Sequence, residues 1–482
     1  MTTRIEHDLL GNREVPADAY WGVHTLRAVE NFPISGVRIG QYASLIEALA
    51  NIKHASALAN GELGLLDARH VDAISRACVE IRNGALHDQF VVDVIQGGAG
   101  TSTNMNANEV IANRALELMG RAKGEYRYLH PNEHINLGQS TNDVYPTALK
   151  LAAWFDAQAL LVAMAELRDA FAAKRDEFAD ILKVGRTQLQ DAVPMTLGQE
   201  FGTYAVMMDE DMLRLREAMA FLREINLGAT AIGTGINSHP QYAALVCRKL
   251  SELTGVDLLT APDLIESTQD CGVFVYLSGA LKRVAVKLGK TCNDLRLLSS
   301  GPRAGFGEIN LPAVQAGSSI MPGKVNPVIP EVVNQIAFEV IGNDLTVTLA
   351  AQAGQLQLNA FEPILGLSLF RSLSHLRHGC ETLSRNCVVG ITANTDHLRE
   401  QVERSIGIAT ALNPYLGYVA ATEIAVEAQV TGASVGEIVL RRGLLSQEAL
   451  DEILRPEKLA RPHSWNASPP DRTDDGRLIS AS

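Results

Sequence analysis

The sequence predicts a mainly all-α fold, because apolar residues recur at intervals of three and four over five long segments. These segments are residues 147–182, 197–225, 272–299, 330–353 and 363–390. At about 1.5 Å rise per residue, the first would form a helix about 50 Å long. The alternation of β-branched and polar residues that marks half-buried strands is nearly absent. Five long helices separated by Gly, Pro and Asn predict a central helical bundle.

Changes in composition and in helical periodicity along the sequence divide the chain into three predicted regions. Residues 1–140 mix short helical patterns with Gly- and Asn-rich loops, which indicates an N-terminal mixed helical and loop domain. Residues 141–395 carry the long helices, and residues 396–482 form a small C-terminal domain of shorter helices. From about residue 461 the chain is polar and turn-rich, and we expect this tail to be disordered.

Composition restricts the possible partners and compartment. The 482 residues are 46% hydrophobic with a net charge of −13, which favours a soluble globular protein and argues against nucleic acid or anionic membranes as partners. No signal peptide begins the chain, and charged residues interrupt its apolar-rich stretch at 149–167, so we expect no membrane span. The six cysteines form no C-x-x-C pair and suit reduced core thiols. A cytoplasmic location follows.

No cofactor is predicted. The twelve histidines show no H-E-x-x-H or comparable spacing, so a catalytic metal has no support in the sequence. Whether a divalent cation such as Mg²⁺ activates the protein is not encoded in any motif.

Four stretches rich in Gly, Ser, Thr and Asn interrupt the helical pattern, at residues 96–106, 138–143, 185–191 and 317–327. Taken alone, each stretch could be explained as a helix cap, since Ser, Thr and Asn are favoured at the N-termini of helices. Four such stretches near the ends of long helices fit a shared pocket better. Neutral hydroxyl, amide and backbone N–H donors at helix N-termini suit a dicarboxylate.

The last stretch reads Gly-Ser-Ser-Ile-Met-Pro-Gly-Lys-Val-Asn-Pro, and its glycines and prolines predict a loop. Such a loop can present a serine oxygen, backbone N–H groups and the ammonium of Lys324 to one anion. It superficially resembles a phosphate loop, but five rather than four residues separate its glycines. Val325 also stands where Ser or Thr would hold magnesium, so we exclude that interpretation.

This loop resembles the signature loop of the fumarase/aspartase superfamily, in which a loop serine removes a carbon-bound proton. The resemblance extends from Arg4 to Leu445. Ala-Gly-Thr-Ser-Thr at 99–103 and Gln-Ser-Thr-Asn-Asp-Val-Tyr at 139–145 are similar to the aspartase (aspartate ammonia-lyase) family. Class II fumarases, the alternative family, usually carry Gly-Thr-Gln-Thr and Ser-Ser-Asn-Asp there.

The resemblance implies reversible deamination of L-aspartate to fumarate and ammonia through an aci-carboxylate intermediate. It implies that Ser318 is the general base. The substrate-contacting positions that it implies are Thr101, Ser140, Thr141, Asn142, Thr187, Gln188, Ser319, Lys324 and Asn326. Gln188 stands where the superfamily commonly has a histidine that pairs with a glutamate at the position of Glu331. Because glutamine cannot titrate, a His–Glu proton relay through this position is in doubt.

The resemblance also implies a homotetramer in which the central helices of four chains form one multi-helix core and different subunits share each active site. The sequence of the first predicted long helix supports this assembly. Its apolar side chains at residues 149–162 spread around much of the helix, which is more than contacts within one chain are expected to cover. Two other functional classes are also compatible with the sequence. A helical scaffold would explain the long helices, and a dicarboxylate-binding protein would use the same pocket without needing Ser318.

Overall fold

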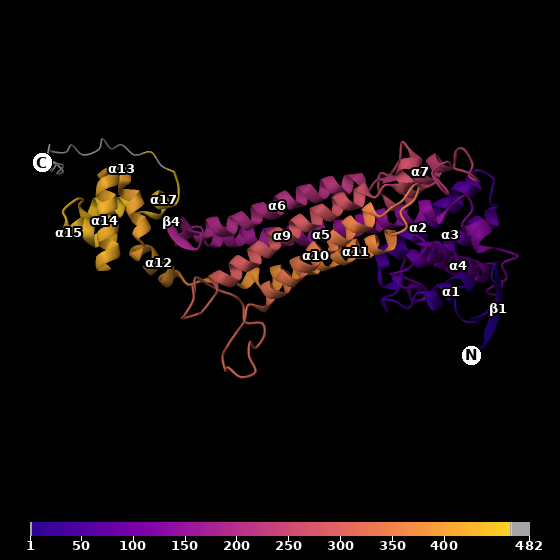
Figure 1. The fold of residues 1–482 in the computed structure, drawn as a ribbon, viewed down its shortest axis with the longest axis horizontal. Helices are drawn as coiled ribbons and strands as arrows, with labels where there is room; N and C mark the ends of the chain where they lie inside the picture. The colour runs from indigo at the N-terminus through magenta and orange to yellow at the C-terminus, as the bar shows by residue number, and fades with distance from the viewer. Residues whose placement is uncertain (1, 463, 465–482) are drawn as a thin grey trace. The chain divides into compact units, whose positions relative to one another are not determined.

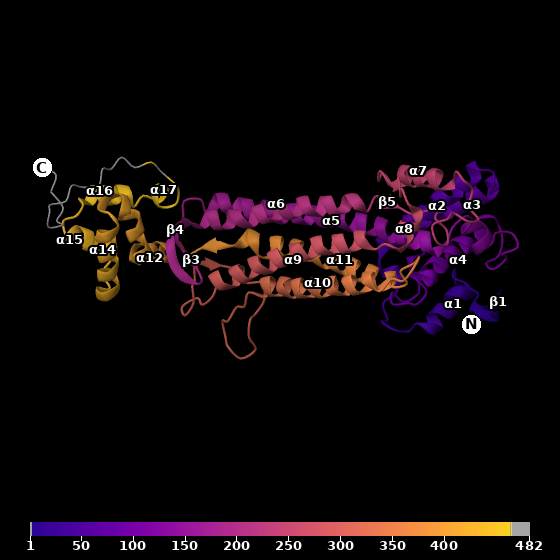
Figure 2. The ribbon, with the colours of Figure 1, turned by 45° about the horizontal axis from the view of Figure 1, so that its top comes forward.

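The computed structural model describes residues 2–462 and 464, and it is built mainly of α-helices (Figure 1). Five of them are long: α5 (Thr141–Glu177), α6 (Leu197–Phe221), α9 (Gly272–Leu298), α10 (Val328–Gln352) and α11 (Glu362–Asn386). They run side by side in both views (Figures 1 and 2). The predicted helical class and the five predicted helices are therefore confirmed.

Shorter elements make up the rest. The helices are α1 (Val23–Asn31), α2 (Ala43–Glu62), α3 (Ala68–Arg82), α4 (Thr101–Leu118), α7 (Tyr242–Thr254), α8 (Leu264–Gln269), α12 (Thr395–Arg404), α13 (Asn413–Leu416), α14 (Tyr418–Thr431), α15 (Val435–Arg441), α16 (Gln447–Ile453) and α17 (Pro456–Leu459). Two antiparallel hairpins pair β1 (Thr3–Asp8) with β2 (Gly11–Pro16) and β3 (Leu182–Thr187) with β4 (Gln190–Thr196). Two-residue strands pair β5 (Glu224–Ile225) with β6 (Leu259–Thr260) and β7 (Ile309–Asn310) with β8 (Thr392–Ala393).

The chain forms two compact units, and each contains part of the long helices. Unit 1 comprises Met1–Ala163, Asp211–Lys287 and Gln335–His378, and unit 2 comprises Met164–Glu210, Leu288–Asn334 and Gly379–Ser482. The division into regions 1–140, 141–395 and 396–482 stays a prediction. The predicted disorder from about residue 461 falls outside the described residues, apart from 461, 462 and 464.

Helix α5 begins six residues before the predicted Thr147 and carries Pro146 inside it. Proline lacks the N–H that would bond to the carbonyl four residues earlier, and that carbonyl belongs to Asn142. The buried Asn226 side chain donates to it instead, at 3.0 Å. The helix therefore continues through the proline because another segment satisfies the vacant acceptor.

Most apolar side chains in the first half of α5 are covered within the chain, whereas Trp154 and Phe155 are half-buried. Leu149, Leu151 and Leu160 are at most 1% exposed, and Val162 is the exposed exception at 63%. Neighbouring helices approach closely. A Cβ at Gly366 of α11 would lie 2.7 Å from Leu149. Alone among the described helices, α5 is long and apolar enough to cross a membrane, yet 61% of its most apolar window is buried, as in a core helix.

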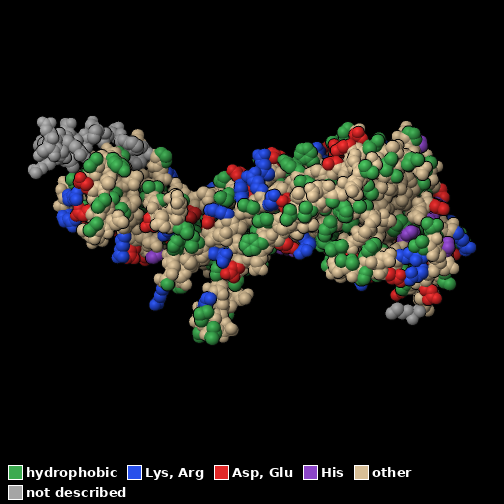
Figure 3. Space-filling view, viewed as in Figure 1, with side chains coloured by type: hydrophobic (Ala, Val, Ile, Leu, Met, Phe, Trp, Pro, Cys, Tyr) green, Lys and Arg blue, Asp and Glu red, His purple; other side chains and the backbone are tan. Residues whose placement is uncertain are grey.

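An exposed apolar stripe lies instead on α10. Phe338, Ile341, Leu345 and Leu349 are 40–67% exposed, and their spacing places them along one side of the helix. All four belong to unit 1. Hydrophobic side chains also reach the surface elsewhere over the long helices (Figure 3). The six cysteines, by contrast, are all buried and free of disulfides.

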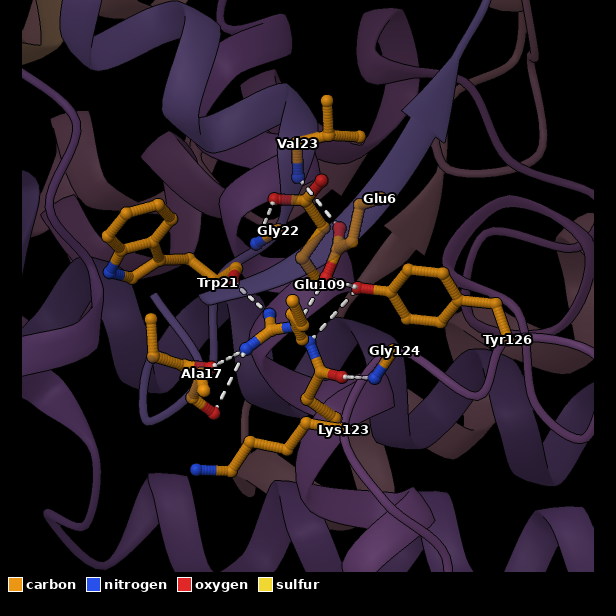
Figure 4. A network of polar contacts seen from close by, with 12 residues as sticks. Glu6, Ala17, Trp21, Gly22, Val23, Glu109, Lys123, Gly124 and Tyr126 are labelled. Atoms are coloured by element: carbon orange, nitrogen blue, oxygen red, sulfur yellow. Dashed lines mark hydrogen bonds and ion pairs between the residues drawn. The ribbon is translucent and has the colours of Figure 1, made fainter. Parts of the chain in front are cut away.

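Two buried carboxylates fix the N-terminus of α1 (Figure 4). Glu109 of α4 accepts hydrogen bonds from the backbone N–H groups of Gly22, His24 and Thr25 at 2.8–3.1 Å, and Glu6 of β1 accepts from that of Val23 at 2.9 Å. They satisfy donors that a helix start leaves free. Burial and the nearby Glu6 raise the pKa of Glu109 to about 7, although hydrogen bonds from this segment oppose the shift.

Candidate active site

The first polar stretch ends at the start of α4. Thr101 is the first helical residue, is exposed, and donates its hydroxyl proton to Gly98 O at 2.8 Å. Gly100 precedes it with φ +88°, and a Cβ there would lie 2.3 Å from the ring of Tyr145 on α5. A glycine is therefore required where the turn before Thr101 packs against α5.

The second stretch forms the start of α5, and the buried Asp143 fixes its shape. Asp143 accepts hydrogen bonds from the N–H groups of Ser140 at 2.9 Å, Gly228 at 3.1 Å and Thr230 at 2.9 Å. Burial raises its pKa to about 6 against these bonds. Asn142 donates from Nδ2 to Ala231 O at 2.7 Å. The half-buried hydroxyls of Ser140 and Thr141 thus sit on a fixed backbone.

An amide network that the sequence did not predict supports Thr141. Asn104 of α4 donates from Nδ2 to Thr141 Oγ1 at 3.1 Å and to Asn136 Oδ1 at 3.2 Å. The fully buried Lys53 donates to Asn136 Oδ1 at 3.0 Å and to Gln139 Oε1 at 2.9 Å. Burial lowers its pKa to about 7. One signal was available in the sequence, namely a lysine in the Ala- and Leu-rich segment at residues 45–59.

The third stretch is a β-hairpin and not a helix end, which corrects its predicted place. Thr187 pairs with Gln190, and the two-residue turn between them has positive φ at both Gln188 (53°) and Leu189 (62°). This matches the twist of a type I′ turn, which Asn and Gly adopt more readily. Thr187 and Gln188 are exposed at its tip.

Ion pairs hold this hairpin within unit 2. The buried Lys183 of β3 lies 2.6 Å from carboxylate oxygens of both Glu200 and Glu308. Arg186 pairs with the second oxygen of Glu308, which is fully buried. The strand that ends at Thr187 is therefore anchored one residue from that position.

The fourth stretch is a loop, as predicted, and it projects away from the helices between α9 and α10 (Figures 1 and 2). Its neck is closed by a hydrogen bond from Gly317 N to Lys324 O at 2.8 Å and by one from Asn326 Nδ2 to Gly317 O at 2.7 Å. A Cβ at Gly317 would lie 2.6 Å from Lys324 O, so only glycine permits this closure.

Ser318 directly follows the neck of the loop and has a distinct environment. Its Oγ accepts hydrogen bonds from the backbone N–H groups of Ile320 at 3.1 Å and Met321 at 2.9 Å. Among the described residues, the side chains of Ser319 and Lys324 make no hydrogen bond or ion pair, and both are exposed. One hydroxyl is thus held by two N–H donors, while a second hydroxyl and an ammonium are free to bind a ligand.

The ten predicted residues fall into two sets. Thr101, Ser140, Thr141 and Asn142 belong to unit 1, where Asn104 links the starts of α4 and α5. The other six are Thr187, Gln188, Ser318, Ser319, Lys324 and Asn326, all in unit 2. Every one is exposed or half-buried in the single chain. Among the described residues, no group of three or more His, Cys, Asp or Glu side chains is placed to hold a metal ion.

Family models match most of the chain. The model of a lyase family matches residues 11–342, and that of the fumarase C C-terminus matches residues 408–461. The crystal structure of a fumarate lyase:delta crystallin from Brucella melitensis bound to cobalt has a TM-score of 0.94 at 54% identity, covering 96% of this chain and 100% of that chain. A class II fumarase from Schistosoma mansoni has a TM-score of 0.90 at 33% identity, with the same coverage. The fold and the matching family model therefore define a helical lyase.

Relatives that match over nearly their full length identify the family of lyases to which the chain belongs. An aspartate ammonia-lyase of Pseudomonas fluorescens is 59% identical over 95% of this chain and 96% of its own length. The aspartate ammonia-lyase of Helicobacter pylori strain J99 is 56% identical over 96% of this chain and 99% of its own length. That of Escherichia coli K12 is 55% identical over 95% of this chain and 96% of its own length. The chain belongs to the aspartate ammonia-lyase family of the fumarase/aspartase superfamily.

Proposed function

We propose that this protein catalyses the reversible deamination of L-aspartate to fumarate and ammonia, with Ser318 as the general base. The observation that carries the role of Ser318 is its pair of backbone N–H donors. A neutral serine hydroxyl is a poor base, and two fixed donors favour its alkoxide. They supply a means of activation that needs no titratable neighbour, which suits a site where Gln188 replaces a histidine.

The alkoxide of Ser318 takes a proton from Cβ of aspartate, and the electron pair spreads onto the β-carboxylate as an aci-carboxylate. We assign Thr101, Ser140, Thr141 and Ser319 as donors to that group, because charge accumulates there in the transition state. Collapse of the aci-carboxylate forms the double bond of fumarate and breaks the C–N bond, so ammonia leaves with the electron pair of that bond.

The remaining residues orient the substrate. Lys324 supplies the unpaired ammonium for the α-carboxylate, together with Asn326, and Asn142 lies near the amino group. Thr187 and Gln188 complete the contacts from the hairpin. Asn326 also closes the loop neck through Gly317, so its amide has a structural task besides binding. The reaction uses only side chains and backbone groups of the chain and requires no organic cofactor.

The active protein would be a cytoplasmic homotetramer with sites shared between subunits. The apolar stripe on α10 supports assembly, because monomeric proteins seldom expose a continuous apolar row of this kind. The exposure of all the predicted residues in one chain supports a site completed by other chains. Three subunits would contribute Thr101, Thr187 and Ser318 respectively to one site.

Ultraviolet absorbance of fumarate tests the proposed reaction. Purified protein should form fumarate from L-aspartate and release equimolar ammonia, while L-malate under the same conditions should give none. Fumarate from malate alone would identify a fumarase instead. Binding of aspartate without any product would indicate a dicarboxylate-binding protein.

A further inference from the structure

A ligand-sized cavity lies in unit 1 and is lined by none of the ten predicted site residues. It has a volume of about 600 Å³, within the range of small-molecule sites. Its walls come from the start of α9, the end of α6, the end of α8 and the buried part of α5. None of the residues that line the cavity takes part in the proposed reaction.

Three carboxylates line this cavity. They belong to Glu224, Glu266 and Asp270. Among the described residues, the side chains of Glu224 and Glu266 have no hydrogen-bond or ion-pair partner, and that of Asp270 accepts only from Gly272 N at 2.8 Å. Burial and the proximity of Asp270 and Glu224 raise the pKa of Glu266, which reflects an excess of negative charge.

Two cationic side chains, Lys150 and Arg223, also line the cavity, and the guanidinium of Arg223 pairs at 3.0 Å with Asp257, which is not part of the lining. Lys150 is 5% exposed and donates to the backbone carbonyl of Glu224 at 2.8 Å, not to a carboxylate. Ser267 is 8% exposed and lines the same cavity, and its hydroxyl has no partner among the described residues. This hydroxyl is therefore available to a ligand bound in the cavity.

Aromatic rings complete the lining. Phe221 and Tyr276 are 59% and 49% exposed, and their rings meet edge to face with centroids 5.4 Å apart. Exposed π-faces beside carboxylates attract cations that also carry an apolar stem. A bare metal ion fits less well, since these carboxylates are not grouped closely enough to coordinate one.

We propose that this cavity binds an aliphatic polyamine-type cation, with its ammonium groups on Glu266, Glu224 and Asp270 and its methylenes against Phe221 and Tyr276. Ser267 would accept a further N–H. The inference does not depend on the proposed reaction, because binding is measured without turnover.

Calorimetry of the full-length protein with spermidine tests the proposal. Glu266→Gln should weaken binding about tenfold, since a charge-assisted hydrogen bond is lost. Tyr276→Leu should weaken it several-fold through loss of the cation–π contact. The matched control is Glu252→Gln, which removes one exposed carboxylate of α7 outside the cavity and should leave affinity unchanged. Thermal melts confirm that each variant is folded.

Three results would overturn the proposal. Absence of spermidine binding is the first. Equal weakening by Glu252→Gln is the second, because it would reduce the effect to attraction by the net charge of −13. Displacement of spermidine by equimolar Mg²⁺ is the third, because it would indicate a metal site.

Discussion

At the scale of single residues, the proposed role of Ser318 as general base requires its hydroxyl to lose a proton before it takes one from carbon. The N–H groups of Ile320 and Met321 both donate to its oxygen, at 3.1 and 2.9 Å, and these donors would stabilise the alkoxide. Donors that need not move during the reaction stabilise the developing negative charge more effectively.

Ser318→Ala is expected to lower turnover by about a thousandfold or more, because the base acts only in the transition state. Aspartate affinity should change by less than about tenfold, since other residues make the ground-state contacts. Fumarate absorbance gives the rate, and calorimetry gives the affinity. Near-normal turnover would remove Ser318 from the role of base.

Lys53 gives a prediction about pH and stability. Its pKa falls from 10.5 to about 7 on folding. Between these pH values the unfolded chain holds a proton that the folded chain has released, so this residue makes the free energy of unfolding rise with pH across the window. Lys53→Met should flatten that rise in urea unfolding between about pH 7 and 9. Identical slopes in variant and parent would show that the pKa of Lys53 is not lowered.

At the scale of elements, the junction of α4 and α5 depends on Gly100. Gly100 and Gly98 have similar φ values of +88° and +91°, but a Cβ at Gly98 would meet nothing closer than 3.8 Å. Gly98→Ala should cost about 1–2 kcal/mol of unfolding free energy through left-handed strain alone. Gly100→Ala should cost about 3 kcal/mol or more, because overpacking against Tyr145 adds to it. Equal costs in thermal or urea unfolding would contradict this packing.

Long periodic segments were predictable from sequence, and boundaries set by tertiary contacts were not. Residues 272–299 were predicted and Gly272–Leu298 is observed, because local periodicity and Gly or Pro punctuation specify such a helix. The early start of α5 depends on Asn226, which lies 80 residues after Pro146. The hairpin at 182–196 was missed because Gln188 and Leu189 adopt positive φ without the usual Asn or Gly.

The candidate site likewise has a part that the sequence predicts and a part that depends on tertiary contacts. The loop and its serine were readable from their Gly and Pro punctuation and from the family resemblance. The support of Thr141 by Lys53, Asn104 and Asn136 was not readable, because it joins three segments distant in sequence. Amide side chains within helices are weak signals, since they also occur at caps and turns.

At the scale of the whole molecule, assembly should depend on the α10 stripe. Leu345 is 60% exposed at its centre, and Leu345→Glu places a charge in an apolar contact. We expect this variant to dissociate to smaller species in light scattering. Val430→Glu on α14 is the control, because Val430 is 81% exposed outside the stripe and its substitution should leave the mass of the assembly unchanged. An unchanged mass for Leu345→Glu would place the interface elsewhere.

The proposed sharing of sites between subunits is tested most directly by mixing the Thr187→Ala and Ser318→Ala variants, each expected to be inactive, after reversible dissociation. If different subunits supply Thr187 and Ser318, some sites in the hybrids receive both intact residues. Fumarate formation from L-aspartate should then recover to a substantial fraction of the parent rate. No recovery in verified hybrids, or full activity of a monomer in light scattering, would contradict the shared site.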